Sequence, residues 1–261
     1  MKTVINVILG ICAAALAWIC VGSIIDDQAL DEKIEARKKL VEARLIDIKK
    51  AEEAYKEQHD TTLVYVDEEA QETKEVTMGA YAESFDVLIA WLKSARYPEQ
   101  IKKEGVIQEE AQRKGWNEAK VARHIYDLRK QGLSDDQIRD RLTAEELPGV
   151  WCDTVWADSP IKALYGREDY PVDSLRYIPC SDVEGEPIEF ELQGQVHYKM
   201  GIPMNYVMEC AAHFNTFLKG MGKAGDNKRV NMTNYEEERG AYPGLKIGDI
   251  MNWNNNAGNW E

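Results

Sequence analysis

The first apolar segment of the chain, Val4 to Ile25, is hydrophobic on every face and contains no charged residue. As a helix it would be about 33 Å long, enough to cross the roughly 30 Å hydrocarbon core of a bilayer. A cleaved signal peptide is the alternative, but its apolar region is usually about 7–15 residues and ends in small residues. Here the run is longer and closes on Ile24 and Ile25. The pattern predicts a transmembrane anchor over residues 1–25.

The charges that flank this segment predict its orientation. Lys2 and the amino terminus lie on one side, and Asp26 and Asp27 on the other. By the positive-inside rule, the amino terminus is cytoplasmic and residues 26–261 lie across the membrane. The lipid bilayer is thus the first predicted partner. Within the span, Asn6 is the residue best able to hydrogen-bond to a neighbouring helix.

Residues 26–60 have the pattern of a long amphipathic helix, a helical stalk that continues the span. The segment lacks glycine and proline and is rich in helix-forming residues. Apolar residues spaced by three, four or seven form a stripe: Leu30, Ile34, Val41, Leu45, Ile48, Ala51 and Tyr55, widened by Leu40 and Ile46. Two interpretations remain open. The stripe packs on the chain's own domain, or it forms a coiled coil that makes the protein a homo-oligomer.

Residues 61–261 are expected to form an α+β domain. Two short β-like runs, 61–66 and 75–78, surround an acidic loop and predict a hairpin. Residues 84–94 then read as a helix with Ser84 as its N-cap. A helical insertion follows over about 108–147, and it would offer a surface to a partner protein.

Within that insertion, one helix is expected from Gln108 to about Lys130 and a second from Ser134 to Leu142. The apolar positions available for docking the pair are few: Val121, Ile125, Leu128, Leu133, Ile138 and Leu142.

From Val150 onward the pattern changes to strands. They are expected at 150–156, at 188–192, at 196–200 after a turn near Gly194, and at 206–210, with a short helix at 214–218. Strands this close together, without helices between them, form a mostly antiparallel sheet.

Charge and cysteine content narrow the function. Lys and Arg number 32 against 46 Asp and Glu, a formal charge of −14. Such a chain lacks the clustered cations that a sequence-independent nucleic-acid binder needs. Cys12 and Cys20 lie in the span and read as small apolar residues. Cys152 and Cys180 each flank a predicted strand, so they are a candidate disulfide, with free buried thiols as the alternative.

No catalytic, cofactor or metal motif is present in the sequence. The 4 histidines are far apart, and the chain lacks the HExxH, GxSxG and GxGxxG patterns and a phosphate loop. Cys210 and His213 are close in sequence, but Cys210 falls in a predicted strand among apolar neighbours. We therefore expect a non-catalytic protein without cofactor or metal.

Two passages resemble type IV pilins and pseudopilins. Residues 44–56 (RLIDIKKAEEAYK) are followed by 81–88 (YAESFDVL), as at the end of the pseudopilin helix. The resemblance implies a pilin-like domain behind a long helix. Pilins also carry a cleavage site after glycine and a glutamate five residues into the mature helix, whereas here Gly10 precedes Ile11 and the span has no glutamate.

The whole chain is also similar to a group of single-span envelope proteins of Bacteroidetes. The resemblance rests on residues 5–10, 44–55, 174–179, 242–248 and 254–261. It implies an inner-membrane protein whose residues 26–261 are periplasmic and whose partners belong to envelope transport machinery of the TonB–ExbB–ExbD kind. We therefore expect a membrane-anchored subunit of an envelope complex. A pilin-like subunit of a filament or secretion apparatus is the alternative.

Overall fold

The computed structural model describes residues 2–67 and 72–261, although most side chains of residues 2–24 lie outside the description. The fold is α+β, with helices and antiparallel sheets, as expected. Two compact units share the first helix and are described separately. The first comprises Met1–Ala43, Ile178–Ile188 and Ala212–Leu245, and the second comprises Arg44–Tyr177, Glu189–Ala211 and Lys246–Glu261.

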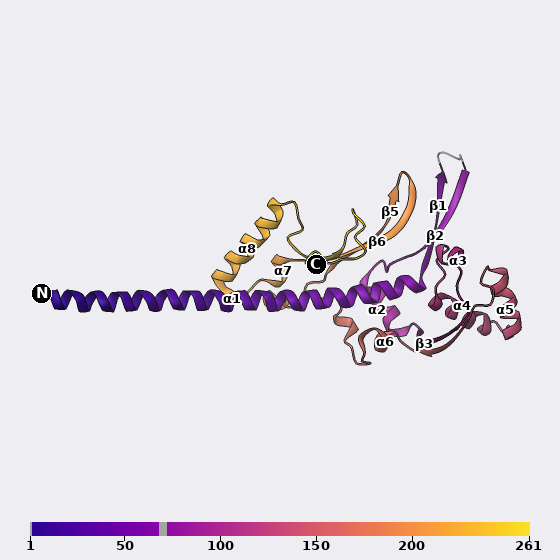
Figure 1. The fold of residues 1–261 in the computed structure, drawn as a ribbon, viewed down its shortest axis with the longest axis horizontal. Helices are drawn as coiled ribbons and strands as arrows, with labels where there is room; N and C mark the ends of the chain where they lie inside the picture. The colour runs from indigo at the N-terminus through magenta and orange to yellow at the C-terminus, as the bar shows by residue number, and fades with distance from the viewer. Residues whose placement is uncertain (1, 68–71) are drawn as a thin grey trace. The chain divides into compact units, whose positions relative to one another are not determined.

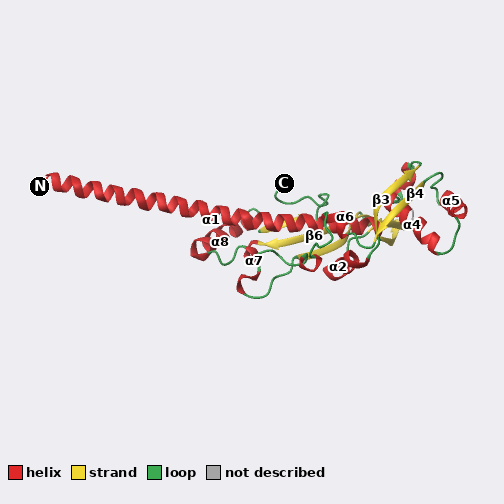
Figure 2. Cartoon of the chain, turned by 90° about the horizontal axis from the view of Figure 1, so that it is seen from below, coloured by secondary structure: helices red, strands yellow, loops and turns green. Residues whose placement is uncertain are grey.

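Helix α1 (Lys2–Gln58) is 57 residues long and runs without a break (Figures 1 and 2). The stalk expected over residues 26–60 is therefore confirmed as a helix, and it is continuous with the preceding segment. At its end, His59 Nδ1 lies 2.8 Å from the Tyr55 carbonyl oxygen. The imidazole ring of His59 also stacks on the ring of Tyr55, with centroids 3.8 Å apart.

The apolar stripe of α1 is buried by the chain itself. Val41, Leu45 and Ile48 are completely buried, and so is Ala51. Each of the larger side chains stabilises the fold by about 1.5–3 kcal/mol through burial. This favours packing on the chain's own domain, while a homo-oligomer through the stalk stays a prediction. The stripe is narrower than expected, because Leu40 and Ile46 are exposed at 54% and 41%.

Within the part of the chain that the structure describes, no helix combines the length and the apolar character needed to cross a bilayer. The predicted span, residues 4–25, belongs to α1 by its backbone. Most of its side chains, including that of Asn6, lie outside the described residues.

In the first unit, α7 (Phe214–Phe217) and α8 (Gly222–Glu238) lie beside α1. Arg37 of α1 donates hydrogen bonds to the carbonyl oxygens of Phe217 and Lys219, at 3.0 and 2.6 Å. Lys228 of α8 forms ion pairs with Asp27 and Asp31 of α1, at 2.7 and 2.6 Å. Helix α7 confirms the helix expected at 214–218. Helix α8 was not expected from the sequence, because it has no apolar stripe to reveal it. The short helix η2 (Asp182–Glu184) also belongs to this unit.

The second unit begins with two elements that the sequence predicted. Strands β1 (Asp60–Asp67) and β2 (Glu72–Gly79) form an antiparallel hairpin. Helix α2 (Phe85–Ser94) starts at Ser84, whose hydroxyl accepts a hydrogen bond from the Val87 N–H at 3.4 Å. This is the N-cap expected from the sequence. The acidic loop between the strands falls largely on residues 68–71, outside the described residues.

The helical insertion lies between two paired strands, β3 (Tyr97–Glu104) and β4 (Trp151–Ala157). Its helices are α3 (Glu109–Arg113), α4 (Glu118–Lys130) and α5 (Asp135–Ala144). The single helix expected over 108–130 is wrong. Gly115, at φ +87°, ends the first piece, and the side chain of Asn117 caps α4 by accepting from the Lys120 N–H at 2.9 Å. Ser134 caps α5 as expected and forms a capping box with Gln137.

The insertion has a small hydrophobic core of its own. Buried side chains from all three helices meet the first residues of β4 there: Ile107, Ala111, Val121, Ala122, Ile125, Leu128, Ile138, Leu142, Leu147, Val150, Trp151 and Cys152. The apolar residues that the sequence offered for docking thus mainly hold the insertion together. It is a folded module carried on a two-stranded ribbon.

Two further short helices, α6 (Ile161–Tyr165) and η1 (Val172–Ser174), follow β4. Two stacked tyrosines fasten this segment to α1. Tyr165 donates to the Asp47 carbonyl oxygen at 3.1 Å, and Tyr170 donates to Asp47 Oδ2 at 2.7 Å. Their rings lie 3.8 Å apart.

The third sheet has the order β5-β6-β7, formed by β5 (Glu191–Lys199), β6 (Ile202–His213) and β7 (Gly244–Gly248). The turn expected near Gly194 is wrong, because the chain turns after Lys199. Gly194 instead lies inside β5, where a Cβ would come within 3.1 Å of the Tyr206 ring. Strand β7 was not expected from the sequence.

The base of the insertion gives a test of the fold. Gly105 and Gly149 both have positive φ, at +80° and +70°. A Cβ on Gly105 would overlap the Gly149 carbonyl oxygen. A Cβ on Gly149 would meet nothing within 4 Å. We expect Gly149→Ala to lower the free energy of unfolding by about 1–2 kcal/mol, the cost of the left-handed backbone. Gly105→Ala should cost clearly more. Denaturant unfolding of both full-length variants measures this difference, and equal losses would contradict the packing described at this site.

Candidate functional site

The most unusual polar group in the second unit is Glu52, on the buried face of α1. Its side chain is 0% exposed. The Ala82 N–H donates to Glu52 Oε2 at 2.9 Å. The other oxygen, Oε1, is buried without a hydrogen-bond partner in the described part of the chain. A buried polar atom without a partner costs free energy, so such a carboxyl calls for an explanation.

Burial controls the protonation of Glu52. Desolvation raises the pKa of this carboxyl to about 8, and the hydrogen bond from Ala82 offsets only part of that effect. Glu52 is therefore largely protonated at neutral pH, so its burial does not place a full charge in the core. Burial also raises the pKa of the phenol of Tyr55, with a further contribution from the charge of Glu52.

A second set of polar contacts surrounds Tyr81. It includes Lys56, which lies one helical turn after Glu52 on α1. Lys56 Nζ lies 3.3 Å from Tyr81 Oη and donates to the Tyr206 carbonyl oxygen at 3.2 Å. The same ammonium lies over the Tyr81 ring, 4.3 Å from its centroid. Burial lowers the pKa of Lys56. Asn256, from the end of the chain, donates to Tyr81 Oη at 2.7 Å and to Glu53 Oε1 at 3.4 Å.

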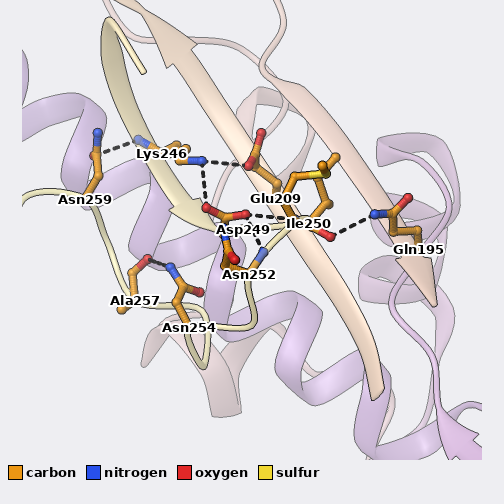
Figure 3. A network of polar contacts seen from close by, with 10 residues as sticks. Gln195, Glu209, Lys246, Asp249, Ile250, Asn252, Asn254, Ala257 and Asn259 are labelled. Carbon is orange, nitrogen blue, oxygen red and sulfur yellow. Dashed lines mark hydrogen bonds and ion pairs between the residues drawn. The ribbon is translucent and has the colours of Figure 1, made fainter. Parts of the chain in front are cut away.

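A third network holds β7 and the C-terminal tail (Figure 3). Lys246 Nζ pairs with Glu209 Oε2 of β6 at 2.9 Å and with Asp249 Oδ2 at 3.3 Å. Asp249 Oδ1 accepts from the N–H groups of Met251 and Asn252, both at 2.8 Å. Burial acts to raise the pKa of Asp249, but these hydrogen bonds and Lys246 outweigh it and hold that pKa below its usual range.

The asparagine-rich tail is thereby folded back on β7. The Lys246 N–H donates to Asn259 Oδ1, and the Asn259 N–H donates to the Lys246 carbonyl oxygen, both at 3.0 Å. Asn255 and Asn256 adopt φ of +56°, a conformation that asparagine tolerates better than most residues. No periodicity in the sequence explains this asparagine-rich run. Its role is to close the sheet and to deliver Asn256 to the α1 network.

These networks organise the fold and do not assemble reactive groups. Within the described residues, no cluster of three His, Cys, Asp or Glu side chains is placed to bind a metal ion. Cys210 is fully buried and burial raises the pKa of its thiol, which makes it a poor nucleophile. His213 serves instead as the N-cap of α7, where its Nδ1 accepts from the Asn215 N–H at 2.9 Å.

One cavity, of about 400 Å³, lies between the β1–β2 hairpin and α4. Its lysine and arginine lining residues each have an acidic partner. Lys120 pairs with Asp60 at 2.6 Å, and Lys114 pairs with Glu146. Arg123 pairs with an acidic residue as well. The cavity is therefore close to charge-balanced and does not favour an anionic ligand.

The two cysteines of the predicted disulfide belong to different units. Cys152 is buried in β4 of the second unit, and Cys180 is half-buried in the first. Both are free thiols in the structure, and their disulfide stays a prediction. The residues that sequence reasoning missed are Glu52 and Asn256. Glu52 did carry a signal, because it lies four residues after Ile48 on the apolar stripe of α1.

The raised pKa of Glu52 predicts that the stability of the fold depends on pH. Its pKa is about 8 when folded and near 4.5 when unfolded. The folded state therefore binds the extra proton, and stability falls as the pH rises from about 4.5 through 8, by about 3–5 kcal/mol in total. Glu52→Gln keeps an acceptor for the Ala82 N–H but cannot ionise. We expect its unfolding midpoint to change less over this pH range than that of the unaltered chain. If the unfolding midpoints of the variant and the unaltered chain changed equally with pH, the account would be contradicted.

The hydrogen bonds of Asn256 to Tyr81 and Glu53 lead to a prediction about how firmly the C-terminal tail is held. Asn256→Asp keeps the size and the backbone preference but removes the N–H donor and adds a charge beside Glu53. We expect it to lower the free energy of unfolding by about 1–3 kcal/mol and to speed hydrogen exchange over residues 246–259. Asn252→Asp is the matched control, since the Asn252 side chain is exposed. Equal exchange in the two variants would show that Asn256 does not hold the tail.

Comparison of the chain with protein-family models, with curated proteins and with solved structures finds no match. In each unit, later segments of the chain are held to α1 by apolar and polar contacts.

Proposed function

We propose that this chain is a non-catalytic, membrane-anchored subunit of a bacterial envelope complex. Residues 1–25 hold it in the inner membrane with the amino terminus in the cytoplasm, and residues 26–261 lie in the periplasm. The observation that carries the proposal is the unbroken α1, whose first part is an uncharged apolar run. The side chains described there support it, because Leu16, Trp18 and Ile25 are 63%, 82% and 57% exposed and do not pack on the chain.

The contacts of α1 suggest what such a subunit does. The helix that enters the membrane is the same helix whose buried stripe and Glu52 hold the second unit together. One continuous helix therefore contains both the proposed span and residues that are packed in the core of the second unit. This suits an accessory to an energised transport machine of the TonB–ExbB–ExbD kind. Asn6 is the proposed contact with a partner span, and the exposed face of the insertion is a proposed contact for a periplasmic partner.

Chemical cross-linking in native membranes tests this proposal. The full chain is purified through a C-terminal tag, and the proteins linked to it are identified by mass spectrometry. We expect a fixed set of inner-membrane partners. The matched control replaces residues 1–25 by a cleavable secretion signal, which should release the protein from the membrane fraction and remove the partners bound through the span. Recovery of the full chain from the soluble fraction, without partners, would contradict the proposal.

A pilin-like subunit is the alternative function. It rests on the same long helix followed by an antiparallel sheet, together with the two pilin-like passages of the sequence. This alternative requires processing near Gly10, so the mass of the mature amino terminus separates the two. The subunit proposal expects the span to be retained.

A further inference from the structure

We propose that β5 is a dimerisation strand, which pairs with β5 of a second copy of this chain and extends the sheet across a two-fold axis at Gln195. The strand lies at the edge of its sheet, where β6 is its neighbour on one side. The N–H and C=O groups on the other side of an edge strand are a template for a further strand. This interface differs from the α1 stripe and does not depend on membrane anchoring.

The sequence of β5 is complementary to itself when two copies run antiparallel about Gln195. Glu191 of one copy then faces Lys199 of the other, and Leu192 faces Tyr198. Opposite charges and apolar pairs directly across two antiparallel strands stabilise the pairing, whereas like charges destabilise it. Because a two-fold interface repeats each contact, both the ion pair and the apolar pair occur twice.

The two faces of β5 also fit this partner. One face carries Leu192, Gly194, Val196 and Tyr198, and the other is polar. Leu192 and Val196 are only half-buried, and Tyr198 is 53% exposed, so the apolar face is incompletely covered in the single chain. A second β5 would continue that face.

The geometry of the strand permits the pairing. The irregularity in the β5–β6 ladder places the extra residue on β6, between Pro203 and Asn205, so β5 itself remains regular. On the polar face, Gln195 donates to the Ile250 carbonyl oxygen at 2.8 Å, which fixes the middle of the strand (Figure 3). The strand also contains no proline, so none of the N–H groups on its outer edge is missing.

Disulfide cross-linking of the full chain in native membranes tests the register. In the proposed dimer Gln195 lies opposite itself, so Gln195→Cys should give a covalent homodimer on mild oxidation. Gln193→Cys is the matched control on the same face. Its two copies would be offset by four residues, roughly 13 Å along the strands, beyond the reach of a disulfide. Equal cross-linking of both variants, or none with Gln195→Cys, would overturn the proposal, as would a Gln195→Cys cross-link to a different protein.

Charge exchange gives an independent readout on the same full chain. Glu191→Lys places two lysines opposite each other at both ends of the interface and should raise the dimer dissociation constant roughly tenfold. Lys199→Glu should do the same, and the double exchange should restore dimerisation. Light scattering in mild detergent measures the dimer fraction. A monomeric unaltered chain, or a double variant no better than the single ones, would contradict the β5 interface.

Discussion

Burial of one apolar stripe on α1 is the constraint on which the rest of the structure depends. A helix of this length in water cannot leave Val41, Leu45 and Ile48 exposed without losing several kcal/mol of hydrophobic stabilisation. The chain covers them with its own later segments. Polar contacts then determine which segments lie where. Tyr165 and Tyr170 bind Asp47, and Ala82 binds Glu52.

The polar groups along α1 make that packing specific. Apolar burial alone tolerates many arrangements, whereas a buried hydrogen bond is satisfied in few. The tail shows this most clearly. Its Met251 and Trp253 stay exposed at 74% and 61%. Asn256 nevertheless reaches Tyr81 and Glu53, because Asn259 and Asp249 fold the tail back on β7. The unpartnered oxygen of Glu52 is the exception, and protonation makes it tolerable.

What the sequence revealed depended on how local the determining contacts are. The stalk, α2 and α5 were predictable, because helical periodicity and the caps Ser84 and Ser134 act within one turn. Helix α8 was not, since distant ion pairs such as Lys228 with Asp27 hold it to α1. A glycine such as Gly194 is typical of a turn, but here its lack of a side chain leaves room for the Tyr206 ring on the next strand. Glu52 stands in the apolar stripe of α1, and this position is visible in the sequence. The sequence does not show how deeply the side chain is buried.

Hydrogen exchange along α1, measured on the full chain in lipid nanodiscs, tests the central claim most directly. If α1 is one helix that joins a membrane span to the folded part, amides of residues 4–25 are protected by the lipid and those of residues 34–58 by packing. The connecting residues 26–33 then exchange as a helix, without a rapidly exchanging hinge. Rapid exchange over residues 4–25, or a hinge between the two protected segments, would contradict the account.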